Sequence, residues 1–436
     1  MGIVRLSGKQ LAAFTKALCG RDLTPRVASY LALNDKNATP IDQVLALYFQ
    51  GPHSYTGEDV LELQAHGGPV VLQMIVARCF EVAAAVPVAE KNKTSGNKQP
   101  TLPYLRLANP GEFTERAYLN HKLDLAQAEA VADLIDASTE AAARGASRSL
   151  AGAFSQEIEQ LRSALIHLRT LVEATLDFPE EEIEFLENAQ ARERLLAVKQ
   201  KLDVLRRGAQ QGKILRDGIQ LVLVGAPNVG KSSLLNRLAG EEVAIVTPIA
   251  GTTRDRVKES IQIGGVAMHI IDTAGLRETS DPVEAKGIER SWHAIQMADL
   301  VIFLTDPNSG EDGLKAKILN EIPPKCPVLE VLNKSDLIAL GSAKDPNVIL
   351  ISAKTGDGID ALKQKILELV GWSGSQEGAI VARRRHLDCL GRASEHIARS
   401  EQFAANGNNS LELFAEELVL AQNHLGQITG KLLPDD

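Results

Sequence analysis

A glycine-rich segment that follows an apolar run constrains the fold of this chain more than any other feature. Residues 225–232 read Gly-Ala-Pro-Asn-Val-Gly-Lys-Ser, which fits the phosphate-loop pattern G-x-x-x-x-G-K-[ST], and the run Ile219 to Val224 precedes it. Such a loop joins a strand to a helix at the carboxyl edge of a parallel sheet, so it predicts an α/β domain. Its backbone amides would surround nucleotide phosphates, Lys231 would contact the terminal oxygens, and Ser232 would ligate Mg²⁺.

Four further segments follow in the order that a nucleotide-binding domain of this type requires. They are Gly-Thr-Thr ending at Thr253, Asp272-Thr273-Ala274-Gly275, Asn333-Lys334-Ser335-Asp336 and Ser352-Ala353-Lys354. A glycine-rich structural turn, the alternative for the first segment, does not account for this order.

The base of the nucleotide is predicted from Asp336. A carboxylate accepts hydrogen bonds from N1 and N2 of guanine, a donor pair that adenine lacks on that edge. A site left with an unpaired buried carboxylate would reject ATP strongly. Lys334 is predicted to lie along the purine face, and the Ala353 amide to meet O6. The predicted GTP contacts are Asn228, Val229, Gly230, Lys231, Ser232, Ser233, Thr247, Pro248, Ile249, Ala250, Gly251, Thr252, Thr253, Asp272, Thr273, Ala274, Gly275, Asn333, Lys334, Asp336, Ser352, Ala353 and Lys354.

Length and composition favour a soluble protein of several domains. The chain has 436 residues, too many for one core, and 44% of them are apolar. No apolar run approaches the roughly 20 residues that cross a bilayer, and the N-terminus lacks a secretory signal pattern. The four cysteines show no paired spacing, as in a reduced cytoplasmic protein. A net charge of −9 argues against a nucleic-acid footprint over the whole surface, and the basic run 383–386 is typical of a solvated helix end.

The apolar pattern divides the chain into segments 1–117, 118–212, 213–372 and 373–436. The first is mixed α+β, the second is helical, and the third alternates strands with helix-length stretches. The last carries one helical stripe, and about 55 residues of helix make a poor core alone, so we expect it to pack on the second segment. The predicted fold class is therefore multidomain, α/β plus all-α. It combines an N-terminal α+β domain, a central helical domain and an inserted Ras-like P-loop GTPase domain with a parallel sheet flanked by helices. The predicted helical core stripes are Leu161, Leu165, Leu168 and Val172; Leu195, Val198, Leu202 and Leu205; and Leu411, Phe414, Leu418, Leu425 and Ile428.

The expected catalytic glutamine is missing. Ras-like enzymes place a water-orienting glutamine directly after the Asp-x-x-Gly segment, but here Leu276 follows Gly275. Candidates to replace it lie slightly further on, in Arg277, Glu278, Asp281 and Glu284. Asn228 in the phosphate loop is a second departure, because its amide oxygen could ligate a monovalent cation beside the phosphates.

These motifs, with two segments outside the GTPase domain, resemble the MnmE (TrmE) family of tRNA-modification GTPases. The nucleotide motifs are joined by Tyr-Thr-Gly-Glu-Asp-Val-Leu-Glu-Leu-Gln-Ala-His-Gly-Gly-Pro at 55–69 and by Pro-Gly-Glu-Phe-Thr-Glu-Arg-Ala-Tyr-Leu-Asn-His-Lys-Leu-Asp-Leu-Ala-Gln-Ala-Glu-Ala at 110–130. The resemblance covers nearly the whole chain. These two segments separate it from ribosome-assembly GTPases, which share the nucleotide motifs.

The resemblance implies a potassium-activated, cytoplasmic GTPase with Mg²⁺ as a second metal. It implies a homodimer whose N-terminal domain binds 5-formyl- or 5,10-methylene-tetrahydrofolate, and a heterotetramer with the MnmG-type protein, which carries FAD. Together they would add an aminomethyl-type group at carbon 5 of the wobble uridine of certain tRNAs. The residues implied are Glu284 as general base, with Lys231 and Asn228 also catalytic; Ser232 and Thr253 for Mg²⁺; Asn228, Thr247, Ile249 and Thr252 for K⁺; and Arg5, Glu62 and Lys122 for folate.

Two features depart from the family pattern, and two rival functions stay open. The family begins with a further strand and ends in Cys-x-Gly-Lys, whereas this sequence starts at Met1 and stops at Asp436. Either the sequence is a fragment of the encoded protein, which we favour, or the protein hydrolyses GTP without completing the modification. The rivals are a ribosome-assembly or RNA-chaperone GTPase, and a switch that binds GTP with little turnover. Ordinary salt bridging is the alternative for the predicted folate contacts.

Overall fold

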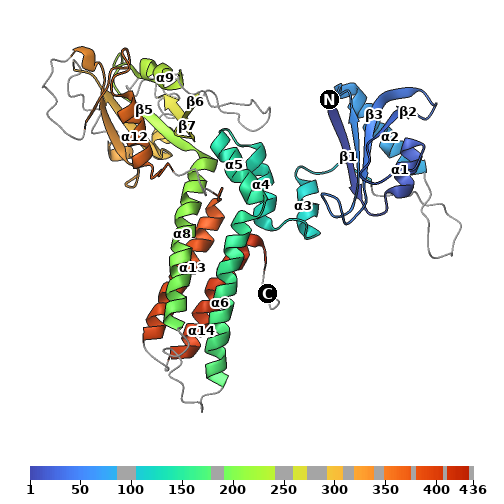
Figure 1. Ribbon diagram of the computed structural model, residues 1–436. Helices are drawn as coiled ribbons and strands as arrows, with labels where there is room; N and C mark the ends of the chain where they lie inside the picture. Colours follow the sequence, from blue (N-terminus) through green and yellow to red (C-terminus); the bar gives the residue numbers. More distant parts are fainter. Residues whose placement is uncertain are drawn as a thin grey trace. The chain divides into compact units, whose positions relative to one another are not determined.

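The computed structural model describes residues 1–85, 105–177, 191–240, 259–272, 292–307, 319–337, 348–374, 380–405 and 410–431. The chain forms two compact units, Met1–Ala128 and Glu129–Asp436 (Figure 1). The domain boundaries expected after residues 117, 212 and 372 stay predictions.

The N-terminal unit is an antiparallel sheet with helices α1 and α2 packed on one face (Figure 1). Its strands lie in the order β1-β4-β3-β2. Residues along β2 and β3 alternate between buried and more exposed, the period-two pattern of a sheet covered on one face. The core between the sheet and helices α1 and α2 includes Phe14, Leu33, Leu61, Leu63 and Ile75. The elements are β1 (Gly2–Gly8), α1 (Ala12–Cys19), β2 (Ser29–Asn34), β3 (Pro40–Phe49), β4 (Asp59–Ala65), α2 (Pro69–Ala85) and α3 (Glu112–Leu119).

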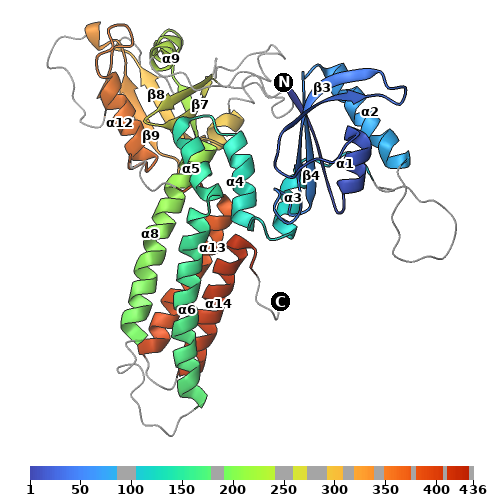
Figure 2. The same cartoon turned by 45° about the vertical axis from the view of Figure 1, so that its right-hand side comes forward.

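Long helices of the second unit form a bundle. Helices α6, α8, α13 and α14 lie side by side (Figure 2). The three predicted apolar stripes are buried between them, which confirms that the last segment of the chain packs on the helices that precede the GTPase motifs. Among the described helices, none combines the length and the apolar character that crossing a membrane requires. The helices are α4 (Leu125–Ile135), α5 (Glu140–Leu150), α6 (Ala153–Asp177), α8 (Ala191–Asp217), α13 (Arg384–Ala405) and α14 (Leu411–Thr429).

A six-stranded sheet carries the nucleotide motifs. Its order is β10-β9-β8-β5-β7-β6, and β6 alone runs antiparallel to its neighbour. Strand β5 is apolar and almost entirely buried because it lies inside the sheet. The predicted fold class is confirmed, and the sheet is mixed rather than wholly parallel because β6 pairs antiparallel with β7. The elements are β5 (Ile219–Val224), α9 (Lys231–Ala239), β6 (Glu259–Ile263), β7 (Val266–Asp272), β8 (Leu300–Thr305), β9 (Val328–Leu332), β10 (Ile349–Leu350) and α12 (Ile359–Leu369).

The end of α8 contacts the segment that leads back from the sheet to the bundle. The Gln211 side-chain amide donates to the Gly371 carbonyl at 2.7 Å and accepts from the Ser373 backbone N–H at 3.0 Å. One residue later, Gly212 lies so close to Ile380 that a β-carbon there would overlap the Ile380 carbonyl oxygen. The chain therefore enters and leaves the nucleotide-binding domain through two backbone segments in direct contact.

Asp133 on α4 joins the same two segments. Its carboxylate accepts from Arg216 Nε, at the end of α8, at 2.8 Å, and from Arg383, just before α13, at 2.8 Å. The Asp133 side chain is 7% exposed, so solvent screens these ion pairs little.

Glu129, one turn earlier on α4, interacts with side chains in the first turn of α13. Its carboxylate forms a bidentate pair with Arg385 at 2.7 Å and 2.7 Å and lies 2.9 Å from His386 Nε2. Burial alone would raise the Glu129 pKa, but the hydrogen bonds from His386 and Arg385 outweigh it and lower that pKa to about 2. The interpretation of residues 383–386 as a solvated helix end is thus wrong for all but Arg384, because the acidic face of α4 covers the run.

Candidate nucleotide-binding site

The phosphate loop connects β5 to α9 and is held by glycines that have no room for a side chain. A β-carbon on Gly225 would overlap the Leu304 carbonyl oxygen, and one on Gly230 would overlap the Asn333 side-chain amide. Gly230 also has φ 98°, a conformation that glycine adopts readily. Glycine at both positions lets the loop close tightly against the ends of the neighbouring strands.

Lys231 and Ser232 begin helix α9, and the first turn of a helix is where backbone N–H groups commonly bind an anion. The Lys231 ammonium donates to the carbonyls of Gly225 at 2.8 Å and Ala226 at 3.1 Å, so it lies within the loop. Ser232 and Ser233 are exposed on the first turn of α9. An exposed hydroxyl beside a phosphate-binding helix end fits one Mg²⁺ ligand, which is the role predicted for Ser232. Among the residues whose placement is known, no group of three or more histidine, cysteine, aspartate or glutamate side chains could hold a metal.

The Asn333 side chain forms hydrogen bonds with both the phosphate loop and the loop after β10. It is 2% exposed. Its Nδ2 donates to the Val229 carbonyl at 2.8 Å, and its Oδ1 accepts from the Ala353 N–H at 2.9 Å. Asn333 therefore positions two other predicted nucleotide contacts. If the Ala353 N–H also donated to guanine O6, its hydrogen would be shared between O6 and Asn333 Oδ1.

The carboxylate of Asp336, which is predicted to bind the guanine base, is oriented by the buried hydroxyl of Ser352. Ser352, which is fully buried, donates through Oγ to Asp336 Oδ1 at 2.7 Å. Asp336 itself is exposed. The bond fixes one carboxylate oxygen and leaves the other available for the two adjacent donors of a guanine edge.

The Lys334 side chain reaches the phosphate loop, and its position along the purine face stays a prediction. Lys334 adopts φ 61°, and its ammonium donates to the Asn228 carbonyl at 2.8 Å and to Asp306 Oδ2 at 2.6 Å. Sequence analysis missed Asp306, although its place directly after strand β8 marks it as a residue at the carboxyl edge of the sheet. It also missed Arg237 on α9, which donates to the Lys354 carbonyl at 2.9 Å.

The remaining predicted residues of this site lie outside the described part of the chain. They are Thr247, Pro248, Ile249, Ala250, Gly251, Thr252, Thr253, Thr273, Ala274, Gly275 and Glu284, together with the side chain of Asp272, whose backbone ends β7. Of the predicted potassium ligands, the structure describes Asn228, which adopts φ 63° within the phosphate loop.

Arg5 and Glu62, two predicted folate contacts, are direct neighbours across strands β1 and β4. Arg5 NH2 lies 2.7 Å from Glu62 Oε1, and its guanidinium carbon lies 5.7 Å from the centre of the Phe113 ring. Lys122, the third, lies beside Gly57, where an added β-carbon would be 3.2 Å from Lys122 Cγ. The ion pair is also what ordinary salt bridging predicts.

A mostly parallel sheet with a phosphate loop, an Asn-Lys-x-Asp loop and a Ser-Ala-Lys loop at one edge defines a P-loop GTP-binding protein. Two family models match the chain: the GTP-binding protein TrmE N-terminus over residues 1–122 and the MnmE helical domain over residues 125–436. The chain belongs to the MnmE (TrmE) family.

Relatives named tRNA modification GTPase MnmE match the whole length of this chain. The tRNA modification GTPase MnmE of Polynucleobacter asymbioticus is 67% identical over 442 aligned residues, covering all of this chain and 93% of the relative. That of Methylibium petroleiphilum is 56% identical, with the same coverage of 100% and 93%. Among solved structures, an Era variant of Aquifex aeolicus bound to GDP and AlF4⁻ is 28% identical and covers 41% of this chain and 66% of that one, with a TM-score of 0.29.

Proposed function

We propose that this member of the MnmE family hydrolyses GTP to GDP and phosphate in the cytoplasm as part of tRNA modification. With an MnmG-type FAD protein, the GTPase cycle would drive folate-dependent addition of an aminomethyl-type group at carbon 5 of the wobble uridine of certain tRNAs. The observation that carries the GTPase part is the link made by Asn333 between the phosphate loop and the base-side loop, beside the oriented Asp336 carboxylate.

Charge neutralisation is the main chemical task of such a site, because phosphoryl transfer spreads negative charge over the transferred group. Lys231 would contact the terminal phosphate, and Ser232 with Thr253 would hold Mg²⁺. Bound K⁺ would supply the positive charge that an arginine provides in other GTPases, with Asn228, Thr247, Ile249 and Thr252 as its ligands. Glu284 would orient and deprotonate the attacking water, since leucine occupies the usual glutamine position at residue 276.

The potassium proposal predicts that turnover rises steeply in potassium chloride compared with sodium chloride at equal ionic strength. Asn228→Ala should lose this response while still binding GTP. Equal wild-type rates of GTP hydrolysis in the two salts, with a transition-state mimic shown separately to associate the GTPase domains in both salts, would exclude it.

The folate proposal depends on Arg5, Glu62 and Lys122 in the N-terminal unit of a homodimer. The glutamate tail of a reduced folate carries carboxylates that suit Arg5 and Lys122, and the pterin N–H groups suit Glu62. Calorimetry with 5-formyl-tetrahydrofolate should show binding that Arg5→Gln weakens and Lys36→Gln, an exposed charge control in the same unit, does not. Ordinary salt bridging predicts no binding by the intact protein.

The whole function is tested by mass spectrometry of wobble uridines in tRNA from cells that lack this protein. We expect the modified nucleoside to be lost, restored by the wild-type gene, and not restored by Lys231→Ala. Retention of the modification together with immature ribosomal subunits would favour the ribosome-assembly alternative.

A further inference from the structure

Helix α8 concentrates positive charge in a chain that is acidic overall. Its residues 191–217 include eight lysines and arginines and three acidic residues, a net charge of +5, whereas the whole chain has −9. Some of these cations stabilise the bundle: Lys199 pairs with Glu401, and Arg192 donates to the Ala404 carbonyl at 3.1 Å. Others are exposed and, among the described residues, have no acidic partner: Arg194, Lys201, Arg206 and Arg207.

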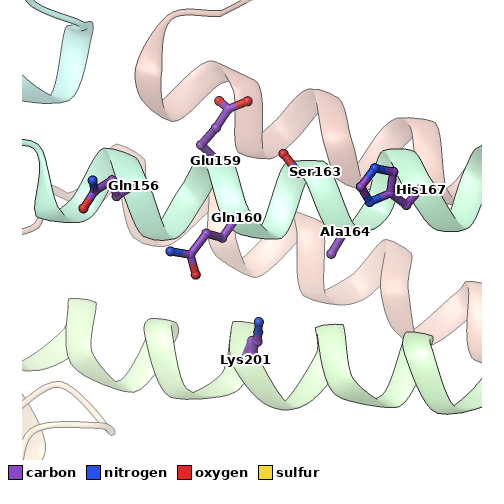
Figure 3. Close-up of a pocket in the computed structure, with 7 residues that line it drawn as sticks. All are labelled: Gln156, Glu159, Gln160, Ser163, Ala164, His167 and Lys201. Carbon is purple, nitrogen blue, oxygen red and sulfur yellow. The ribbon is translucent and has the colours of Figure 1, made fainter.

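One of the exposed cations, Lys201, lines a groove between α8 and α6. The groove has a volume of about 540 Å³, and its other lining residues all come from α6. Gln160 and Ala164 point toward α8, and Lys201 stands opposite them on α8 (Figure 3). The lining is mostly polar and includes Gln156, Gln160, Ser163 and His167. Lysine, serine and glutamine are the side chains that commonly bind phosphate and sugar oxygens of nucleic acids.

The single carboxylate of the groove is neutralised from elsewhere. Glu159 points away from α8 (Figure 3) and pairs with Lys431 at 3.0 Å and Arg162 at 3.2 Å. Burial opposes ionisation of Glu159, but these two cations more than offset it and hold its pKa below the ordinary value. Glu159 therefore remains ionised with its charge compensated, and the positive charge of Lys201 dominates the groove.

Gly208 provides free space on the face of α8 that carries Lys201. It lies seven residues after Lys201, hence on the same side of the helix, and a β-carbon added to it would meet no atom within 4 Å. Arg194 lies seven residues before Lys201, hence on this side too, whereas Arg206 and Arg207 are turned about 140° and 120° away from Lys201 around the helix axis. From Arg194 to Gly208 this face extends roughly 20 Å, a length over which a nucleic-acid duplex presents on the order of ten phosphates. A surface of this length suits a polyanion better than a single small anion.

We infer that the α6–α8 groove, together with Arg194 and Lys201 on the same face of α8, forms a contact surface for the phosphate–ribose backbone of RNA. The inference rests on the proposed function, under which that RNA is the tRNA substrate. Contacts of this kind position an RNA without reading its sequence. They also make binding strongly dependent on salt, because each neutralised phosphate releases counterions.

The test uses the intact protein and an unmodified tRNA transcript with a wobble uridine, titrated at several salt concentrations. Gly208→Glu and Gly208→Lys place opposite charges beside the groove at a position with free space, and Gly208→Ala is their neutral control. Lys201→Gln removes one contact, and Lys325→Glu changes an equally exposed charge elsewhere in the same unit. GTP hydrolysis without tRNA should be the same in all five variants.

We expect Gly208→Glu to weaken tRNA binding about tenfold or more and Gly208→Lys to tighten it several-fold. Lys201→Gln should lower the slope of log affinity against log salt by about one, while Gly208→Ala and Lys325→Glu bind like wild type. Wild-type affinity in both charged Gly208 variants and in Lys201→Gln would overturn the inference and leave the proposed function intact. Absence of tRNA binding by the wild type at low salt, alone or with its FAD partner, would overturn both.

A protein partner is the rival occupant, because Leu196 and Val204 on α8 are 49% and 61% exposed. Such a partner would use these apolar side chains as well as charge. Val204→Ser should therefore leave tRNA affinity unchanged. If Val204→Ser weakens association with the FAD partner while the charge variants leave tRNA binding unchanged, the surface belongs to that protein and the inference fails.

Discussion

Replacing Gly212 by alanine tests how the nucleotide-binding domain is attached to the helical bundle. In the structure, a β-carbon at residue 212 would overlap the Ile380 carbonyl oxygen, and it would lie 2.7 Å from the Ile380 carbonyl carbon and 3.1 Å from the Ala382 nitrogen. All of these are backbone atoms, so no side-chain rotation relieves the overlap. Helix α8 or the returning segment must move.

Gly208, four residues earlier on the same helix, provides a matched control. Its added β-carbon would meet nothing within 4 Å, so Gly208→Ala should stabilise the helix by about 0.5–1 kcal/mol. Gly212→Ala gains the same helix propensity but adds an overpacking penalty, typically about 1–3 kcal/mol and at the upper end here because the obstacle is backbone. We expect the unfolding free energies of the two variants to differ by about 2–3 kcal/mol.

Urea unfolding followed by far-ultraviolet circular dichroism measures this difference, with the GTPase rate as a second reading. Gly212→Ala should unfold at lower urea concentration than wild type, and Gly208→Ala at the same or higher concentration. Equal midpoints for the two variants would refute the close approach of α8 and residue 380.

Three further predictions concern single side chains. Glu284→Ala should leave GTP affinity nearly unchanged and lower turnover by roughly 10²-fold, measured with a fluorescent GTP analogue and phosphate release; wild-type turnover would transfer the role to Glu278 or another group. Asn333→Ala should weaken GTP binding about tenfold or more, because it leaves the Val229 carbonyl and the Ala353 N–H without their partner; unchanged affinity in the same titration would show that the link is dispensable. Glu129→Gln should destabilise the protein by about 2 kcal/mol at neutral pH after allowance for solvent screening, since the pKa of Glu129 is lowered from 4.5 to about 2. Ionised Glu129 stabilises the fold above its unfolded pKa, so the difference from wild type should shrink as pH falls from about 4.5 toward 2, and a gap that does not depend on pH would contradict the assignment.

Local motifs predicted the nucleotide-binding loops because their chemistry resides in a few consecutive residues. The phosphate loop is one continuous segment whose glycines and lysine are required by its own geometry. The apolar stripes of α6, α8 and α14 were equally predictable, since helical periodicity is local.

The sequence pattern could not predict contacts between segments that lie far apart in the chain. Nothing local to Asn333 indicates that it bonds Val229 and Ala353, and Gly212 resembles any helical glycine until Ile380 is placed beside it. The basic run 383–386 was interpreted as solvated because the acidic residues that cover it, Glu129 and Asp133, lie some 250 positions earlier in the sequence.

The central claim is that the sheet edge binds and hydrolyses a guanine nucleotide. The most direct test changes both the nucleotide base and Asp336, the residue predicted to recognise it. Xanthine has a carbonyl where guanine has its amino group, and an asparagine amide can donate to that carbonyl. Steady-state hydrolysis of GTP and XTP should be measured for wild type and for Asp336→Asn. The account predicts that wild type prefers GTP and that Asp336→Asn loses GTP hydrolysis and gains XTP hydrolysis. Unchanged GTP affinity and turnover in Asp336→Asn would contradict it.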